Sequence, residues 1–517
     1  MINKNIFKKC VQSLKEAGFV NIVYTMIGIF FALFFSCGLI NYLPKLRSRI
    51  TYWYVLPVFW AYVFIFFIYV IFRKSLQRTE EKKLKCFLFL IALLPRLLLL
   101  IHRRFILISD YQAYVNMGTY MLTGQKELTY NIVNNYRIPK YGGLAVFMAI
   151  IGKLFSTNLI GYQIANIIMS ALICVLVYLI VEDYSKNAAI FASFLMAVYP
   201  ADIIASQVVT NREGAVLFIL LAYILLKRSL KKQSIICLIA SGICIAISDF
   251  WHPSAIVPVI AFLCFGSMTL FVKNREEERQ LVYFKFKSIM IVLISYFIFV
   301  NIGLGALKVY GLTDNTQSDF TLAKLVIGFN YETRGTYSAD DAAIRSLPKE
   351  EQEKVYKQMF RERIIEKSPQ DILFLMKDKV ATLWFAEDGY FYWYHAVWQQ
   401  DMKEKFNSGI ISEDEYAKVM TELRITGSFS NFDWIYLGMC YLFAIVGVLV
   451  RNKENSGLNL VSWLLLGWIM IHLLIEVQSR YRDLAMPYVM IFTAIGAEWC
   501  YNKILKNVLK KGHSISA

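Results

Sequence analysis

Charged side chains are scarce in this sequence. Asp, Glu, Lys and Arg make up 18% of its 517 residues, whereas about a quarter of a soluble domain is charged. Hydrophobic residues make up 57% of the chain. This composition excludes an ordinary soluble globular protein and is typical of an integral membrane protein.

Several motifs that carry chemistry in other proteins are also missing. The nine cysteines form no CxxC pair, and none falls in a connection expected outside the membrane, which excludes a disulfide framework and a cysteine-based metal site. There is no Gly-rich phosphate loop, no internal repeat and no series of alternating ten-residue barrel segments. The spanning elements are therefore expected to be helices.

Long apolar runs recur from residue 19 to residue 502. At about 1.5 Å per residue, each is roughly long enough to cross the hydrocarbon core. We therefore predict an all-α polytopic membrane protein with about 12 transmembrane helices and two extracytoplasmic segments. The predicted spans are 18–42, 52–72, 84–101, 158–182, 187–206, 212–228, 234–250, 253–272, 286–306, 432–450, 458–476 and 483–502.

The net charge of +17 is distributed unevenly between alternate connections. Most basic residues fall in the N-terminus, in 73–85, 227–232 and 273–287, and in the tail after residue 502. The positive-inside rule then places both termini in the cytoplasm. The excess charge reports topology, so we expect the lipid bilayer as a partner and no nucleic acid.

This topology divides the chain into five parts and leaves two sizeable segments outside, where ordered loops commonly carry function. The parts are an N-terminal tail with two extra spans (1–83), a membrane core (84–306) containing the first outer loop (102–157), a large extracytoplasmic segment (307–431), C-terminal spans (432–502) and a basic cytoplasmic tail (503–517).

Each outer segment has one notable apolar feature. Leu144–Phe155 is too short to cross the membrane and predicts a re-entrant or interfacial helix. The second segment contains a dense aromatic patch between Trp384 and Trp398. Such a patch is ordinarily a belt at the lipid–water boundary, and the alternative is a surface on which sugar rings stack.

The third span places a carboxylate at the outer boundary. Arg96 lies inside the span, Arg103 and Arg104 follow at its outer end, and Asp110 comes a few residues later. Asp110 is placed to accept a proton from a hydroxyl that approaches from outside. The alternative is that Asp110 only caps the helix expected over Tyr111–Leu122.

Three further polar clusters are expected at the same face. Glu213, after Arg212, is either a site residue or a first-turn acid favoured by the helix dipole. His252 lies in a tight outer turn and is either a ligand or a solvated loop residue. Arg480 and Arg482 break the charge bias, so they either bind a phosphate or form ion pairs with Glu476 and Asp483.

These features resemble the C-type superfamily of membrane glycosyltransferases, which use polyprenyl-phosphate-linked sugars and include the protein O-mannosyltransferases and the lipid A aminoarabinose transferase. The resemblance runs from about residue 84 to residue 502. It rests on the order of the Arg-bearing span with Arg103–Tyr114, the Val198-Tyr199-Pro200 run leading to Asn211–Phe218, the Gly328-Phe329-Asn330 and Thr333-Arg334-Gly335 segments, and Glu476–Pro487 with its Arg480-Tyr481 pair.

The resemblance implies that Asp110 is the catalytic base and that Arg480 contacts the carrier phosphate. It also implies that the acid at Glu213, where many relatives carry Asp, helps to shape the site. The full set of expected substrate-binding residues is Arg103, Arg104, Tyr111, Arg212, Glu213, His252, Arg480, Tyr481 and Arg482.

The expected activity is inverting transfer of a sugar from a polyprenyl-phosphate carrier to an extracytoplasmic glycan, lipid or protein of a bacterial cell envelope. No metal or other cofactor is expected to be required. Two alternatives remain: a polysaccharide polymerase or ligase that uses undecaprenyl-diphosphate-linked glycans, and a flippase or transporter of lipid-linked sugars. The grouping of ionisable residues at one boundary disfavours a transporter, which places them near the midplane.

Overall fold

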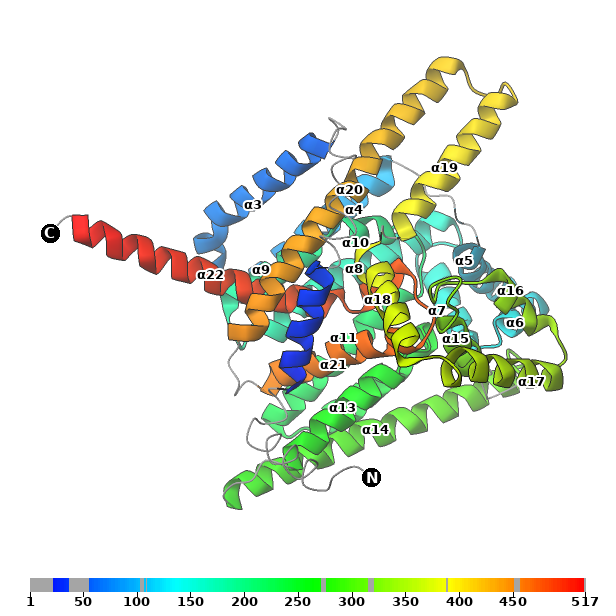
Figure 1. Cartoon of the computed structure of the whole chain (residues 1–517), viewed down its shortest axis with the longest axis horizontal. Helices are drawn as coiled ribbons and strands as arrows, with labels where there is room; N and C mark the ends of the chain where they lie inside the picture. Colours follow the sequence, from blue (N-terminus) through cyan, green and yellow to red (C-terminus); the bar gives the residue numbers. More distant parts are fainter. Residues whose placement is uncertain are drawn as a thin grey trace.

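The computed structural model is an assembly of helices (Figure 1). It describes residues 22–36, 55–102, 107, 109–270, 276–314, 320–386, 389–450 and 456–515. No strand occurs among these residues, and the predicted all-α polytopic membrane fold is confirmed. Arg103 and Arg104 lie outside the described residues.

The helices follow one another with short connections. After a helix at Ile22–Ser36 come α3 (Val55–Arg78), α4 (Glu81–His102), α5 (Ser109–Leu122), α6 (Lys126–Tyr136), α7 (Tyr141–Leu154), α8 (Leu159–Val181), α9 (Lys186–Ala197), α10 (Pro200–Ala205), α11 (Arg212–Lys232), α12 (Ile235–Trp251), α13 (Ile256–Leu270) and α14 (Glu276–Tyr310). The second half contains α15 (Phe320–Gly328), α16 (Ala339–Ala343), η1 (Ile344–Ser346), α17 (Lys349–Phe360), η2 (Arg361–Ile365), α18 (Pro369–Phe385), α19 (Gly389–Asn407), α20 (Glu413–Val450), α21 (Ser456–Leu474), η3 (Ser479–Leu484) and α22 (Met486–Ile515).

A helix occupies each predicted span, but the spans differ in length. Among the described residues, five helical stretches are long and apolar enough to cross a membrane: Val58–Arg78, Glu81–His102, Leu159–Val181, Phe286–Tyr310 and Phe432–Val450. The predicted span at 187–206 is not one helix. It is broken into α9 and α10 because Pro200 lacks an N–H and therefore starts a new helix at its first position.

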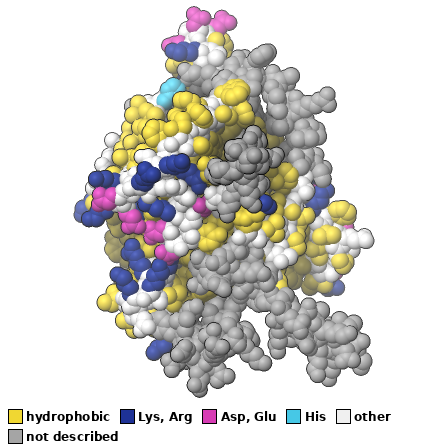
Figure 2. Space-filling view, turned by 90° about the vertical axis from the view of Figure 1, so that its left-hand side faces the viewer, with side chains coloured by type: hydrophobic (Ala, Val, Ile, Leu, Met, Phe, Trp, Pro, Cys, Tyr) yellow, Lys and Arg dark blue, Asp and Glu magenta, His cyan; other side chains and the backbone are white. Residues whose placement is uncertain are grey.

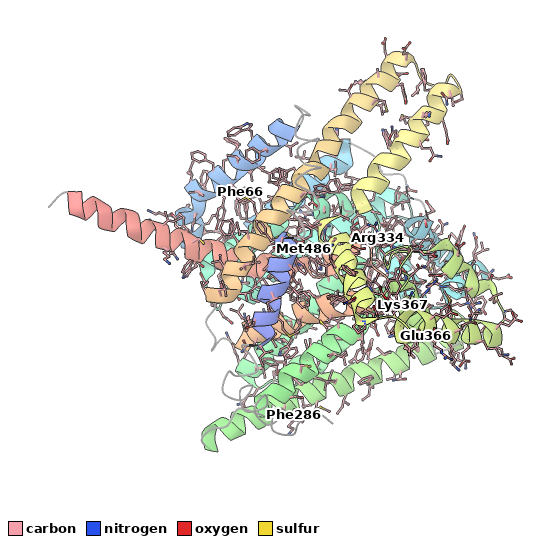
Figure 3. All side chains as sticks on the ribbon, in the orientation of Figure 1. Phe66, Phe286, Arg334, Glu366, Lys367 and Met486 are labelled. Atoms are coloured by element: carbon pink, nitrogen blue, oxygen red, sulfur yellow. The ribbon has the colours of Figure 1, made fainter. Side chains whose placement is uncertain are left out.

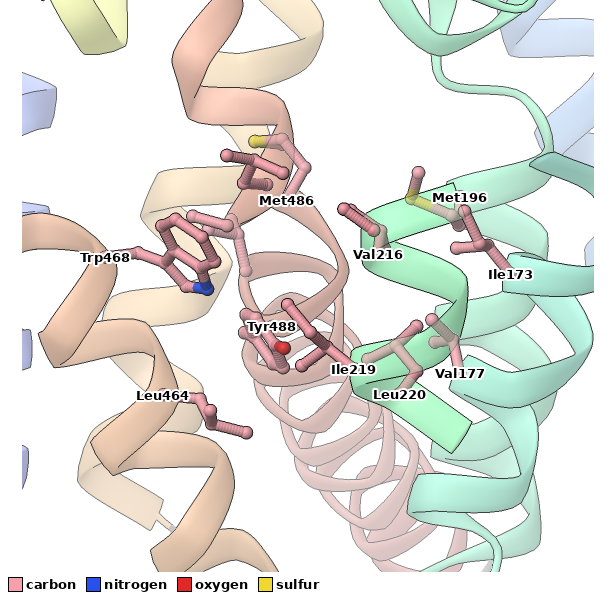
Figure 4. Close-up of a cluster of buried hydrophobic side chains, with 14 of the residues drawn as sticks. Ile173, Val177, Met196, Val216, Ile219, Leu220, Leu464, Trp468, Met486 and Tyr488 are labelled. Atoms are coloured by element: carbon pink, nitrogen blue, oxygen red, sulfur yellow. The ribbon is translucent and has the colours of Figure 1, made fainter. Parts of the chain in front are cut away.

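The core lies where α8, α9, α11, α21 and α22 meet (Figure 4). Its side chains come from segments far apart in the sequence, and their close contacts supply the dispersion energy that holds helices together in lipid. The labelled members are Ile173, Val177, Met196, Val216, Ile219, Leu220, Leu464, Trp468, Met486 and Tyr488.

Helices α20 and α22 approach each other through two glycines. A Cβ atom added at Gly496 would lie 1.9 Å from the Phe443 carbonyl oxygen, and one at Gly447 would lie 2.0 Å from the Phe492 carbonyl oxygen. Both obstacles are backbone atoms, so neither helix can accommodate a side chain without moving. Small residues at these positions therefore set the distance between the two helices.

We expect Gly447→Ala to destabilise the fold by about 1–3 kcal/mol, the usual cost of overpacking. Gly438→Ala is the matched control, because Gly438 lies on the same helix with open space around its Cβ position. Thermal denaturation of the two purified variants in detergent measures the difference. Equal melting temperatures would show that the α20–α22 contact does not require glycine.

Basic side chains gather at the end of the molecule that faces the viewer in Figure 2. Lys186 Nζ donates to the Gln77 carbonyl at 2.8 Å, and Lys231 pairs with Asp183 at 2.6 Å. These contacts join the connections after α3, α8 and α11, which the alternation of charge assigns to one side. Helix α4 leads from this end toward Asp110, and α11 leads back from Arg212 to this end.

Residues 307–431, which the sequence predicts to lie outside the membrane and which are called the outer segment below, form two substructures. Helices α15 to α18 pack beside α21, and Arg334, Glu366 and Lys367 belong to this part (Figure 3). Helix α19 and the first half of α20 form a hairpin that projects from the body (Figure 1). Leu144–Phe155, the expected re-entrant or interfacial helix, falls in α7, which is helical as predicted and packs against α5 and α12.

The interpretation of the aromatic patch was wrong for its first members. Trp384, Phe385, Tyr390 and Phe391 are neither a boundary belt nor an exposed sugar-stacking surface, because all four are buried in the main core. Trp384 stacks on Phe34 with the ring centroids 4.5 Å apart. The clustering of aromatic residues thus reflects the junction between the outer segment and the membrane helices.

Candidate active site

The polar clusters predicted at one face do lie near one another at one end of the helix assembly. Direct contacts connect the start of α5 to η3, and the start of α11 to both α7 and η3. These segments are separated by up to several hundred residues in the sequence. The helices thus bring the first outer loop and the C-terminal Arg-Tyr pair to one place.

Asp110 lies in the first turn of α5 and is partly exposed. Its Oδ1 accepts a hydrogen bond of 2.9 Å from the Tyr136 hydroxyl. Burial, and after it the charge of Asp110, raises the pKa of Tyr136 well above its usual range. The Tyr136 hydroxyl therefore stays protonated and acts as the donor.

A group of tyrosines continues from this pair into the protein. The Tyr136 ring meets the Tyr141 ring edge-on at 5.1 Å, and Tyr114 lies 6.2 Å from Tyr136. The Tyr141 hydroxyl accepts from Asn211 Nδ2 at 3.2 Å. Asp110 is therefore connected to the start of α11 through aromatic side chains.

Arg480 contacts Tyr111, the residue that follows Asp110 in the sequence. Its guanidinium donates to the Tyr111 hydroxyl, and it sits 5.7 Å from the Tyr111 ring centre and 5.8 Å from that of Tyr481. No ion pair between Arg480 and a carboxylate is seen among the described residues. A guanidinium held by tyrosines keeps its positive charge for an anionic ligand.

The backbone before Arg480 is fixed by the outer segment. The Glu476 N–H donates to the Lys324 carbonyl at 3.0 Å, and the Val477 N–H donates to the Gly335 carbonyl at 2.8 Å. The Glu476 side chain pairs with Lys324 and accepts from the Tyr481 hydroxyl at 3.3 Å. Lys324 and Gly335 thus fix the backbone that precedes the Arg480-Tyr481 pair.

A buried lysine, Lys379, stabilises the same region. Lys379 Nζ donates to the Gly328 carbonyl at 2.9 Å and to the Leu473 carbonyl at 2.7 Å, at the ends of α15 and α21. A cation is favoured at helix C-termini, which explains its position. Burial lowers the pKa of Lys379 to about 7, and Glu476 opposes this shift.

His252 follows α12 and faces the same region. Burial, and after it the basic groups of His472 and Lys324, lowers its pKa to about 4, so the imidazole is neutral at neutral pH. Its Nδ1 is buried without a hydrogen-bond partner among the described residues. His252 is thus half-buried, with this nitrogen shielded from solvent.

Arg212 and Glu213 are part of a buried ionic network. Arg212 contacts Asp483, lies 2.5 Å from Glu213 Oε1 and lies 3.3 Å from Asp202 Oδ1. Asp202 also pairs with Arg96 at 2.5 Å, which explains the arginine inside the third span. The carboxylates around Arg212 already satisfy its charge.

Arg482 is also enclosed by protein. It is completely buried, and it donates to the Ala386 carbonyl at 2.8 Å and to Asp433 at 3.1 Å. The alternative of ion pairs is therefore right in kind but wrong in its partners. Glu476 pairs with Lys324, Asp483 pairs with Arg212, and Arg482 pairs with Asp433.

Sequence reasoning missed three residues that the structure places here. Tyr136, Lys324 and Tyr390 lie in stretches without a polar cluster, and Tyr390 reaches the site with its ring 5.1 Å from the Arg212 guanidinium. Only the aromatic patch gave a signal for Tyr390. Nothing in the sequence pattern distinguishes Tyr136 or Lys324 from their neighbours.

The fold and this polar end define a helical membrane protein with a charged site at one boundary. The family described as dolichyl-phosphate-mannose-protein mannosyltransferase matches residues 143–301, from α7 to α14. The resemblance to the C-type superfamily of membrane glycosyltransferases is thereby confirmed over this part of the chain.

Two further comparisons were made. The archaeal oligosaccharyltransferase AglB from Archaeoglobus fulgidus, in complex with an inhibitory peptide and a dolichol-phosphate, is similar with a TM-score of 0.42 and 13% identity. The similarity covers 84% of this chain and 52% of that chain, so this chain spans about half of its length. No curated protein sequence matches this chain.

Proposed function

We propose that the protein transfers a sugar from a polyprenyl-phosphate carrier to an acceptor hydroxyl at the extracytoplasmic face. The observation that carries the proposal is the convergence of a partly exposed Asp110 with Arg480 across Tyr111. One group accepts a proton and the other attracts a phosphate. The family match supports a donor of the lipid-phosphate-sugar class.

The proposed reaction is a single displacement with inversion. The acceptor oxygen forms a bond to the anomeric carbon while the bond from that carbon to the carrier phosphate oxygen breaks. The proton of the acceptor hydroxyl goes to Asp110, and polyprenyl phosphate leaves with the bonding electrons. Arg480 stabilises the charge that develops on the leaving group.

The other predicted residues take supporting roles. Tyr111 and Tyr481 hold Arg480, and His252 offers a neutral ring at the same site. Buried ion pairs shape the site without contacting the substrate, and they are formed by Arg212, Glu213 and Arg482. Arg103 and Arg104 lie outside the described residues, and their binding to the carrier stays a prediction.

We expect Arg480→Gln to raise the KM for the lipid-linked donor about tenfold or more, because a charge-assisted bond to phosphate is worth about 1.5–3 kcal/mol. Arg361→Gln is the control, since Arg361 is exposed on the outer segment and pairs only with Glu366 among the described residues. Steady-state kinetics with lipid-linked sugars extracted from the source membranes gives both values. An unchanged KM would remove Arg480 from the phosphate site.

The function itself is tested with the purified protein in proteoliposomes. With extracted polyprenyl-phosphate sugars and an envelope-glycan extract, we expect release of free polyprenyl phosphate, measured by mass spectrometry. Release of polyprenyl diphosphate with lengthened glycan chains would indicate a polymerase or ligase instead. Movement of the lipid between leaflets without sugar transfer would indicate a flippase.

A further inference from the structure

Tyr136 meets Asp110 at the very end of a helix. Helix α6 stops there because Arg137 adopts a left-handed conformation, with φ of 51°, and its N–H bonds to the Asn134 carbonyl. The Tyr136 hydroxyl then donates to Asp110 Oδ1 at 2.9 Å. Asp110 is thus held by a residue on a regular element and not by a loose loop.

The Tyr136 ring is fixed by two other aromatic rings. Its centroid lies 5.1 Å from that of Tyr141, in an edge-on arrangement, and 6.2 Å from that of Tyr114. Tyr114 and Tyr141 are both buried, and they belong to α5 and α7. These contacts restrict the direction in which the Tyr136 hydroxyl points.

Arg137, the residue after Tyr136, is held by the outer segment. Arg137 Nη1 donates to Gln352 Oε1 at 2.7 Å, and Gln352 is itself buried. Gln352 Nε2 in turn donates to the Arg345 carbonyl at 2.8 Å. Tyr136 therefore stands where helix α17 of the outer segment and the membrane helices both hold α6.

We propose that Tyr136 is a positioning residue for Asp110, which holds Oδ1 of the carboxylate so that Oδ2 is presented to the acceptor hydroxyl. The inference rests on the proposed role of Asp110 as base. Tyr136 makes and breaks no covalent bond in the reaction. It acts by restricting the two rotatable bonds of the Asp110 side chain, which otherwise sample several orientations.

The expected effect of losing this contact lies in turnover. Misplacement of a catalytic group by about 1 Å can cost about a hundredfold in rate. Tyr136→Phe removes the hydroxyl and keeps the packed ring, so we expect kcat to fall about tenfold or more. The KM for the lipid-linked donor should stay within about twofold, because Arg480 is untouched.

Tyr130→Phe is a closely matched control. Tyr130 lies on the same helix and its hydroxyl also donates to an aspartate, Asp314, but this pair is exposed and lies outside the site. The two variants thus lose the same kind of bond from the same helix. We expect Tyr130→Phe to retain the kcat and KM of the wild-type protein.

The kinetic experiment uses full-length protein in proteoliposomes, with sugars on polyprenyl phosphate extracted from the source membranes, and melting temperatures are recorded in parallel. A fall in kcat for Tyr136→Phe alone, without a rise in KM, supports the inference. A Tyr136→Phe variant with wild-type kcat overturns it and leaves the transferase proposal intact.

A second measurement is independent of activity. A hydrophobic carbodiimide must reach a carboxyl oxygen to react, and the Tyr136 hydroxyl occupies Oδ1 of Asp110. We expect labelling of Asp110, followed by peptide mass spectrometry, to be severalfold faster in Tyr136→Phe than in the wild-type protein or Tyr130→Phe. Faster labelling without any transfer by the wild-type protein would reject the transferase while the Tyr136–Asp110 contact stands; equal labelling in all three would reject the contact.

Discussion

Asp110→Asn is expected to lower sugar transfer about a thousandfold, within the range that general base catalysis contributes. An amide has nearly the same shape as the carboxylate and still accepts the Tyr136 hydrogen bond at its oxygen, but it cannot take the acceptor's proton. The loss should appear in kcat while the protein folds normally. Single-turnover transfer with the enzyme in excess over the donor measures it.

The control for this experiment is Asp314→Asn. Asp314 also accepts from a tyrosine of α6, Tyr130, but it lies at an exposed position outside the site. Its variant should transfer sugar at the wild-type rate. If Asp110→Asn did the same in purified proteoliposomes, the proton would have to go elsewhere and the base assignment would be wrong.

The second large effect is expected at Arg212, and it concerns folding. Arg212→Met leaves Asp202, Glu213 and Asp483 buried without their shared cation. Removing one partner from a buried ion pair costs about 3–5 kcal/mol, and here three carboxylates lose it together. We expect little monodisperse protein after extraction and a strongly lowered melting temperature, as measured by size-exclusion chromatography and thermal denaturation in detergent.

Two other arginines separate this effect from a general loss of charge. Arg361→Met removes a side chain that is 74% exposed, and an exposed pair contributes about 0–1 kcal/mol. Arg480→Met removes a cation held by tyrosines and should fold with impaired donor binding. A stable Arg212→Met protein with weakened donor binding would instead make Arg212 a direct ligand of the phosphate.

The sequence allowed the class of fold to be predicted because hydrophobic length and charge asymmetry are strong local signals. It also indicated which positions lie at one face. Successive apolar runs cross the membrane in opposite directions, and the ends of these runs on one face carry Asp110, Arg212, His252 and Arg480. Topology alone brings such positions to the same end of the molecule, and the structure gathers them there.

What the sequence could not separate was the role of one arginine from another. Arg480 and Arg482 are two residues apart in η3, yet one lies between tyrosines and the other is buried against Asp433. The direction of each side chain depends on turns and on partners distant in the chain. The break before Pro200 was missed because the apolar pattern continues across it, although proline itself was a signal.

The pairing of Lys324 with Glu476 has a consequence for the evolution of this protein. The first residue belongs to the outer segment and the second to the C-terminal spans, and the backbone of each also bonds to the other's segment. A change of charge at one position is tolerated only with a compensating change at the other. Among homologues these two positions should therefore vary together, and an outer segment exchanged between relatives should function only when the stretch before the Arg-Tyr pair is exchanged with it.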